Sequence, residues 1–491
     1  MRSTADSTRT RRRRAEATLL WAAIGCAAAL APALAEGQTA DLESDLEIGD
    51  QPAHTTLVYP PYAHTLGIHR ARPAHLKLFL GDRTRFDDPQ GVAAVKFASD
   101  DDPQARGDDF QLTLFGVNSG RNEILYNSSM QTLAIYGRRG SGEDELAEPH
   151  GIAATVDGRV YVADTGNRRV VRLRWDPEAR ALAWVGSWPA GAPFDVEADA
   201  RGDAWATDRA ADAVLRFPDH EAGAGTELLP APVVSGDRWP LPGDVEAPLG
   251  LAIMDSLDPW LQPNATRLYL VDKDGLRLRA YDSEGRVVAS IEAADVAAGR
   301  ENARFFYVEI DYFGNLYVSD PGGGRIYKLD PSLRLLASFT GPGPAEAALE
   351  EPRGIAIWKR FGQVFVAERD GAQYFFVGTD VRPVAEPVRV RRREAPSSWA
   401  LELFLTEAAT VQVAFVDAAG DTLAVADAGT VGAGRQSVEW DDGGWRSSPA
   451  EGWEERAVRI VVEARPTYSS RRRFARVKAL SFVWEGALTG P

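Results

Sequence analysis

The chain has 491 residues, of which 44% are hydrophobic and 9% aromatic, a composition that argues against intrinsic disorder and allows two or three folded domains. Its formal net charge is −16, and the body of the chain has no basic patch with interleaved aromatic residues, so we expect no nucleic-acid partner. The single cysteine, Cys26, excludes disulfides and cysteine-bound zinc from the rest of the chain.

The first 35 residues have the three parts of a secretory signal peptide. A basic start, Arg11–Arg14, precedes an apolar stretch from Ala17 to Leu34, and Ala33-Leu34-Ala35 is a small-residue cleavage site. A transmembrane anchor is the alternative, which Pro32 and the small residues disfavour. We therefore predict a bacterial protein that is secreted or held in the periplasm or cell envelope, with no membrane span in the mature chain. Residues 36–75 are predicted to be an extended leader.

A motif recurs six times in the part of the chain that follows. In each copy, an acidic or amide residue ends a β-branched run, and a second residue, most often polar or basic, opens the next run five positions later. The first residues of these pairs are Asn118, Asp164, Asp208, Asp272, Asp320 and Glu368. Four of the five intervals between successive members of this series have the roughly 40 to 50 residues of one four-stranded propeller blade. The sequence therefore predicts a six-bladed β-propeller over residues 76–382.

A second motif, Pro-x-Gly or a degenerate form of it, opens a short apolar strand upstream of five of the six pairs. The residues that follow the proline are Gln90, His150, Phe194, Leu249 and Arg353, and the fifth repeat has Phe305-Phe306-Tyr307 instead. We expect Gln90, His150 and Arg353 to point to the mouth of the central tunnel, and they are our candidate ligand-binding residues. For Arg353, an ion pair with Glu350 or Glu351 is the alternative role.

The last strand of each repeat has alternating apolar residues, then an aromatic residue and a glycine, and the sixth repeat lacks this strand. Leu76–Leu80, which precedes the first Pro-x-Gly motif, has the same pattern. We therefore predict that Leu76–Leu80 is the outer strand of the last blade, beside Val364–Val366 and Tyr374–Phe376. Such pairing would close the ring and remove two exposed sheet edges.

The second repeat carries the clearest family signature. Glu148–Ala153, Val160–Asp164 and Asn167–Val170 reproduce in order the strand, Ala-Asp and Asn-x-Arg-Val signatures of the NHL-repeat family, which the chain resembles over residues 76–382. The resemblance implies a six-bladed propeller. In the peptidyl-hydroxyglycine amidating lyases of this family, histidines from different blades hold zinc. Here only His150 stands at a suitable position, so we expect no metal and no cofactor.

The C-terminal part continues the β pattern. Residues 383–396 are rich in proline and arginine and are predicted to be a linker. Residues 397–487 contain alternating runs separated by glycine turns, which predicts an Ig-like β-sandwich. Asp417–Gly420 and Val438–Asp441 resemble the Ig-like module of flagellar hook-capping proteins. The predicted fold class is all-β, a six-bladed propeller followed by an Ig-like sandwich that folds independently, because the linker offers little apolar surface for docking.

The recurrent aspartates could form cation sites, but we favour the interpretation that each one caps its own turn. The acidic stretch Ser99–Asp109 could bind calcium, although its spacing is not that of an EF-hand. There is no Gly-x-Ser-x-Gly motif and no cysteine nucleophile. We therefore favour a monomeric binding or scaffold protein of the cell envelope that engages a protein, peptide or glycan. The alternative is an extracytoplasmic lyase or hydrolase, which a dense set of convergent titratable groups at the tunnel mouth would favour.

Overall fold

The structure is a computed structural model. It describes residues 57–58, 70–101, 112–128, 132–219, 237–238, 244–297, 300, 302–340, 348–394, 397–446, 448–467 and 475–485. The predicted signal peptide, most of the leader and most of the acidic stretch after Ser99 lie outside these residues. Among the described helices, none has the length and apolar character needed to cross a bilayer.

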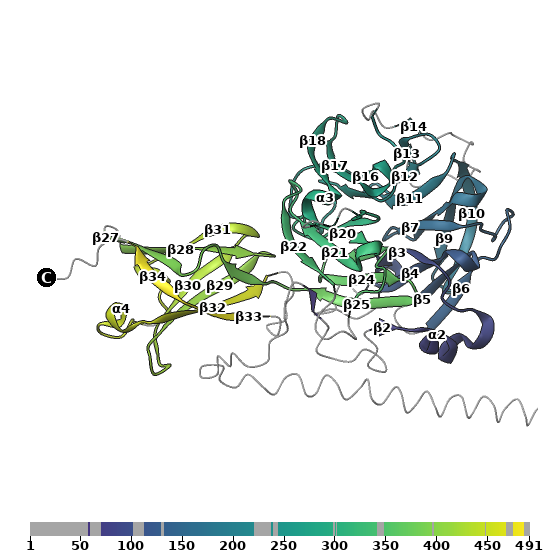
Figure 1. The fold of residues 1–491 in the computed structure, drawn as a ribbon. Helices are drawn as coiled ribbons and strands as arrows, with labels where there is room; N and C mark the ends of the chain where they lie inside the picture. The colour runs from purple at the N-terminus through teal and green to yellow at the C-terminus, as the bar shows by residue number, and fades with distance from the viewer. Residues whose placement is uncertain are drawn as a thin grey trace, which may run out of the picture. The chain divides into compact units, whose positions relative to one another are not determined.

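Six antiparallel sheets follow one another along the chain, and each is one blade of a propeller (Figure 1). Blade 1 contains β3 (Pro89–Val95), β4 (Thr113–Asn118), β5 (Glu123–Ser128) and β6 (Thr132–Tyr136). Blade 2 contains β7 (Pro149–Ala154), β8 (Arg159–Asp164), β9 (Arg169–Asp176) and β10 (Ala181–Pro189). Blade 3 contains β11 (Pro193–Ala198), β12 (Ala204–Asp208), β13 (Ala213–Phe217) and β14 (Asp237–Arg238).

The second half of the ring repeats this arrangement. Blade 4 contains β15 (Leu251–Met254), β16 (Arg267–Asp272), β17 (Arg277–Asp282) and β18 (Val287–Glu292), and the short helix α3 (Ala293–Val296) follows it. Blade 5 contains β19 (Val308–Ile310), β20 (Leu316–Asp320), β21 (Arg325–Leu329) and β22 (Leu335–Phe339). Blade 6 contains β23 (Ile355–Trp358), β24 (Gln363–Glu368) and β25 (Gly371–Val377). The inner strands β3, β7, β11, β15, β19 and β23 touch their neighbours in a closed ring, which confirms the predicted six-bladed propeller.

The six acidic or amide residues of the first sequence motif all end the second strand of a blade, as the repeat predicts. Asp164 is fully buried, and it accepts a 2.7 Å hydrogen bond from Ala147 N and another of 2.7 Å from Arg169 Nε. Asp208 has no basic partner five residues later, and it accepts instead from the backbone amides of Gly191 and Ala192 at 2.6 and 2.9 Å. Asp208 also accepts hydrogen bonds from Ala210 N and Ala211 N of its own turn, as predicted, whereas the backbone bonds above tie both aspartates to the loop that leads into their blade.

The prediction that Leu76–Leu80 closes the ring as a strand is wrong. These residues lie in helix α2 (Pro73–Leu80), which begins with proline, a residue preorganised for the first helical turn. Leu76 and Leu80 are four residues apart and pack on Leu125, whereas Leu78 is 69% exposed. A short leucine run fits both the helical period of 3.6 residues and the strand period of two, so the apolar pattern alone could not separate helix from strand.

The ring is nevertheless closed by the N-terminal part of the chain. Strands β1 (Leu57–Val58) and β2 (Arg70–Ala71) both pair antiparallel with β25, and the side chain of Leu57 is fully buried. Arg70 also forms a 2.9 Å ion pair with the buried Glu368, the last residue of β24. N-terminal strands therefore complete the last blade, as predicted, but these strands are β1 and β2, which precede Leu76–Leu80 in the chain.

Deleting residues 36–72 from the mature chain is expected to abolish the soluble monomer, because the edge of β25 then becomes available for pairing with other molecules. Size-exclusion chromatography with light scattering measures the oligomeric state, and calorimetry measures the melting transition. Deleting residues 36–55 instead keeps β1 and β2 and is the matched control. A monomer with an unchanged melting transition after the longer deletion would show that closure does not depend on these strands.

The glycines of the Pro-x-Gly motif allow the inner strands to approach closely around the axis. A Cβ atom on Gly91 would lie 2.7 Å from the carbonyl oxygen of His150, and one on Gly354 would lie 2.4 Å from that of Gln90. Such contacts are too short for any side chain. Glycine is therefore needed at these positions because neighbouring blades pack closely at this end of the axis.

The C-terminal part is a sandwich of two sheets. The first contains β26 (Val381–Pro383), β28 (Ser397–Leu405), β27 (Val388–Glu394), β34 (Phe482–Glu485) and β31 (Gly434–Asp441). The second contains β30 (Thr422–Val431), β29 (Ala409–Val416), β32 (Arg459–Pro466) and β33 (Arg476–Leu480), and helix α4 (Trp453–Arg456) precedes β32. Between the sheets, the ring of Phe415 lies 4.7 Å from Trp453 and 5.8 Å from Trp484. Val388–Glu394, predicted as linker, instead pairs with β28 and β34, so the linker prediction is wrong for these residues.

A buried polar cluster joins the sandwich to blade 5. Asp50–Pro491 forms one compact unit, and within it Glu407, at the turn between β28 and β29, forms an ion pair with Lys328 of β21. Asn315 Nδ2 lies 3.2 Å from Glu407 Oε1, and Lys328 Nζ lies 3.6 Å from Asp311 Oδ2. Lys328, Glu407 and Asp311 are all fully buried, and burial raises the pKa of Glu407 to about 8. The sandwich therefore has a buried contact with the propeller, contrary to the expectation that it has little surface for docking.

Candidate functional site

The three residues predicted to bind a ligand lie where the inner strands begin, and each has partners within the protein. Gln90 is 4% exposed, and the hydroxyl of Tyr307 donates a 3.4 Å hydrogen bond to its Oε1. His150 Nδ1 lies 2.9 Å from the carbonyl oxygen of Glu148 and 2.8 Å from Thr165 Oγ1, and burial lowers the pKa of the ring. These bonds hold both side chains inside the ring of blades.

Arg353 pairs with an aspartate of the first blade. Its Nη1 bonds to Asp88 and donates to the carbonyl oxygen of Pro89 at 3.2 Å, whereas Glu351 is 3.7 Å away. The contact links the beginnings of the sixth and first blades. The guanidinium is mostly buried, so much of its hydrogen-bonding capacity is used inside the protein.

Aromatic rings fill the same end of the axis. The ring of Phe194 lies 4.8 Å from that of His150, 5.3 Å from Phe306 and 5.5 Å from Tyr307. These residues come from three different blades and stack across the centre of the ring. The structure therefore brings Gln90 and His150 toward one packed centre rather than toward an open mouth.

A cavity of about 390 Å³ lies at the opposite ends of the same strands. Residues of β3, β7, β11, β19 and β23, the inner strands of five blades, line it, together with Asp258–Trp260 from blade 4. A cavity bounded by the inner strands must lie on the propeller axis, and we call it the axial cavity. None of the three predicted site residues lines it. Its volume is in the range of small-molecule sites.

Two glutamates distinguish the axial cavity from the rest of the ring. Glu197 of β11 and Glu309 of β19 line it, and they occupy equivalent positions in their blades, four residues after the first residue of the Pro-x-Gly motif or its substitute. The corresponding residues of the other four blades are Ala93, Ala153, Ala252 and Ala356. The replacement of alanine by glutamate at this position is visible when the six repeats are aligned, whereas the predicted site residues come from the position next to the proline.

Burial sets the electrostatics of these carboxyl groups. It raises the pKa of Glu309 to about 7, although the charge of Lys359 opposes the shift. Burial also raises the pKa of Glu197 well above its ordinary value, and the charge of Glu309 adds to this effect. Asp195, two residues before Glu197, has its pKa raised to about 7 by burial. Near neutral pH the carboxyl group of Glu309 can therefore gain or lose a proton inside the cavity.

The lysine of the axial cavity is already paired. Lys359 Nζ lies 3.1 Å from Asp258 Oδ2. Burial disfavours its ammonium form, but the charges of Asp258 and Glu309 outweigh burial and raise its pKa. The indole rings of Trp260 and Trp358 line the cavity beside this pair. The arrangement combines carboxylates, one ammonium group and aromatic surface in a single concave site.

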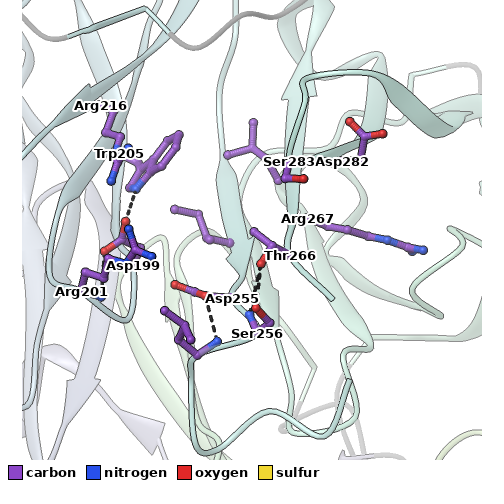
Figure 2. A pocket seen from close by; sticks show the side chains of 13 residues that line it. Asp199, Arg201, Trp205, Arg216, Asp255, Ser256, Thr266, Arg267, Asp282 and Ser283 are labelled. Carbon is purple, nitrogen blue, oxygen red and sulfur yellow. Dashed lines mark hydrogen bonds between the residues drawn. The ribbon is translucent and has the colours of Figure 1, made fainter. Parts of the chain in front are cut away.

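A second pocket of about 290 Å³ lies between blades 3 and 4 (Figure 2). The indole of Trp205 donates a 2.9 Å hydrogen bond to Asp199, which also lines the axial cavity. Ser256 and Thr266 are hydrogen-bonded at 3.0 Å, and Arg267 donates to the carbonyl oxygen of Pro331 at 2.8 Å. Several polar groups of this pocket are thus engaged with each other or with the backbone.

The described residues contain no group of three or more histidine, cysteine or acidic side chains placed to hold a metal ion. His150, which stands at the position of a zinc-binding histidine in the lyases of the resemblance, has Glu148 and Thr165 as its partners. The chemistry available in the axial cavity is therefore that of carboxyl, ammonium and aromatic groups.

The comparison with known families agrees with the repeat. The sequence pattern described as "NHL repeat" matches residues 146–173, which span β7, β8 and most of β9. The second blade is similar to an NHL repeat over these residues. A search of curated protein sequences finds no match to the chain.

Several solved propeller structures are similar to this chain. A gluconolactonase from Xanthomonas campestris is 15% identical, with a TM-score of 0.40, over 67% of this chain and 100% of that one. An inactive virginiamycin B lyase from Staphylococcus aureus, solved with quinupristin, is 15% identical, with a TM-score of 0.37, over 54% of this chain and 77% of that one. An aldose sugar dehydrogenase from Streptomyces coelicolor is 14% identical, with a TM-score of 0.37, over 60% and 96%.

Proposed function

We propose that this chain is an exported, monomeric binding protein of the bacterial cell envelope whose propeller captures a small polar ligand in the axial cavity. The observation that carries the proposal is the pair Glu197 and Glu309, which line this cavity where four other blades have alanine. The ligand site is thus placed at the other end of the axis from Gln90, His150 and Arg353. The C-terminal sandwich, proposed to be an Ig-like module, would space the propeller or dock it to an envelope partner.

The fold of the propeller does not require these two glutamates. Alanine completes the same strand position in four blades, so a propeller can form without a carboxyl group there. Burying a carboxylate without a cation disfavours folding, as the raised pKa of Glu309 records. Titratable groups held at a cost to stability in a cavity are typical of functional sites.

A lyase or hydrolase is the second candidate, because the pKa of Glu309 is raised to about 7. A group with a pKa near the working pH can both donate and accept a proton, which general acid–base catalysis requires. Glu197 and Glu309 would then divide the acid and base roles, and Lys359 would stabilise developing negative charge. Conversion of the captured compound would distinguish this candidate from binding alone.

Retention of a small molecule from an envelope extract tests the proposal. The mature protein is mixed with the extract and separated by gel filtration, and mass spectrometry identifies the retained compounds. We expect at least one compound to be retained by the native protein and lost from the double variant Glu197→Ala, Glu309→Ala. The double variant should melt at a higher temperature than the native protein, because it removes two carboxyl groups that burial disfavours.

Glu178→Ala is the matched control, because Glu178 is an exposed glutamate of the same propeller outside the cavity. Equal retention by the double variant and this control would place the ligand elsewhere. Recovery of the compound with an altered mass, dependent on Glu309, would favour the lyase or hydrolase.

A further inference from the structure

The charges that line the axial cavity do not balance. Five carboxyl groups and two cationic groups belong to its described lining. The two cations already have acidic partners, since Arg159 lies 2.6 Å from Asp157 and Lys359 lies 3.1 Å from Asp258. Asp199 accepts hydrogen bonds from the Trp205 indole and from backbone amides. Glu197 and Glu309 therefore have no counter-ion of their own, because Lys359, whose charge acts on both of them, is already paired with Asp258.

Backbone amides supply the contacts that Glu197 and Glu309 do have. Ile310 N donates a 2.8 Å hydrogen bond to Glu309 Oε1, and Ala198 N donates to Glu197. Among the described residues, no cationic nitrogen lies within 4.0 Å of either carboxylate. Each carboxylate has capacity for further donors, since an ionised carboxylate accepts about four hydrogen bonds. The free capacity can be used by donors that carry positive charge.

The inner strands add apolar side chains to the cavity wall, which restricts the kind of cation. The inner strands contribute Val92, Ala94, Ile152, Ala154, Ala198 and Ile357. A hydrated metal ion would gain nothing from such a wall, and two carboxylates alone do not complete the six or more oxygen ligands that calcium takes. An organic cation would place methylene groups against the wall and its charge beside the glutamates. The ring of Trp358 adds aromatic surface that attracts cations, whereas the guanidinium of Arg360 already lies 5.1 Å from the ring centre of Trp260.

We propose that the axial cavity binds an alkylammonium group, with the ammonium between Glu197 and Glu309 and the aliphatic chain along the alanine, valine and isoleucine side chains. The inference rests on the proposed function and names the class of ligand. A lysine side chain, a diamine and an amino-lipid fragment all present this chemistry, and a free amine of matched length represents it.

The proposal predicts how binding depends on pH. Glu309 faces Lys359, Asp258 and Asp311, and Glu197 faces Glu309, Asp195 and Lys359. The raised pKa of Glu309, about 7, means that it is mostly protonated below neutral pH and loses its charge there. An alkylammonium keeps its charge until about pH 10, as a lysine side chain does. Affinity should therefore rise as pH increases through about 7.

Calorimetric titration with 1-pentylamine, 1-pentanol and pentanoate tests the class of ligand. We expect the native protein to bind 1-pentylamine at least about tenfold more tightly than either analogue at about pH 8. Between about pH 6 and pH 8 the affinity for the amine should increase by about tenfold. The double variant Glu197→Gln, Glu309→Gln preserves the side-chain volume and should lose about tenfold or more in affinity, whereas Glu178→Gln should bind as the native protein does.

The outcomes separate the class of ligand from the site. Equal binding of the amine and the alcohol, or no binding of the amine by the native protein, would overturn the cationic ligand. Retention of an uncharged extract compound that depends on Glu197 and Glu309 would keep the proposed function and overturn this inference. Amine binding that the glutamine double variant does not weaken would overturn the placement of the ammonium group.

Discussion

Replacing Lys328 with methionine is expected to lower the free energy of unfolding by about 3 kcal/mol or more, because the buried acidic groups beside it lose their cation. Lys328 lies between Glu407 of the sandwich and Asp311 of blade 5, and all three side chains are fully buried. Methionine fills a similar volume, so the effect reports charge rather than packing. Urea unfolding measures the free energy, and limited proteolysis shows whether the sandwich is released from the propeller.

Lys77→Met is the matched control for this prediction. Lys77 forms a 3.1 Å ion pair with Asp82, but the two side chains are 71% and 89% exposed. Ion pairs in such surroundings contribute about 1 kcal/mol or less. A loss of stability in Lys328→Met that is no larger than in Lys77→Met would mean that the cluster does not hold the two domains together.

Stability is expected to fall as the pH rises from about 5 to about 8, in contrast to a protein stabilised by surface ion pairs. Burial raises the pKa of Asp195 and Glu309 to about 7 and that of Glu407 to about 8. The folded state therefore holds protons that the unfolded chain has already released. Each group reduces the free energy of unfolding by up to about 1.4 kcal/mol per pH unit between its unfolded and folded pKa.

Differential scanning calorimetry at a series of pH values measures this dependence. The variant Glu197→Ala, Glu309→Ala serves as its internal test, because it removes Glu309 together with Glu197, whose pKa burial also raises, while leaving Asp195 and Glu407 in place. The decline in melting temperature between about pH 5 and pH 8 should become shallower in this variant. A native protein that melts at a higher temperature at pH 8 than at pH 5 would contradict the assigned pKa directions.

The regularity of the repeat explains why the blades could be predicted. The carboxyl group of Asp164 and its counterparts must end the second strand in order to reach the loops, so its position marks strand boundaries along the chain. The sequence predicted that N-terminal residues close the ring, but it did not identify which residues form the closing strands. Leu57–Val58 and Arg70–Ala71 are two-residue strands, too short for alternation to be recognised, whereas Leu76–Leu80 alternates and is helical.

The packed surroundings of Gln90 and His150 have a physical cause that the sequence does not display. His150 and Gln90 have the polar chemistry expected at a tunnel mouth, but Phe194, Phe306 and Tyr307 pack against them across the ring. Such packing depends on contacts between blades far apart in sequence. The junction through Glu407 was missed for the same reason, since its partner Lys328 lies 79 residues away.

A crystal structure of the mature protein grown with 1-pentylamine tests the central claim most directly. The account predicts electron density for the amine in the axial cavity, with its nitrogen within hydrogen-bonding distance of Glu197 and Glu309. Density for the amine beside His150 and Arg353, with the axial cavity empty, would contradict the account.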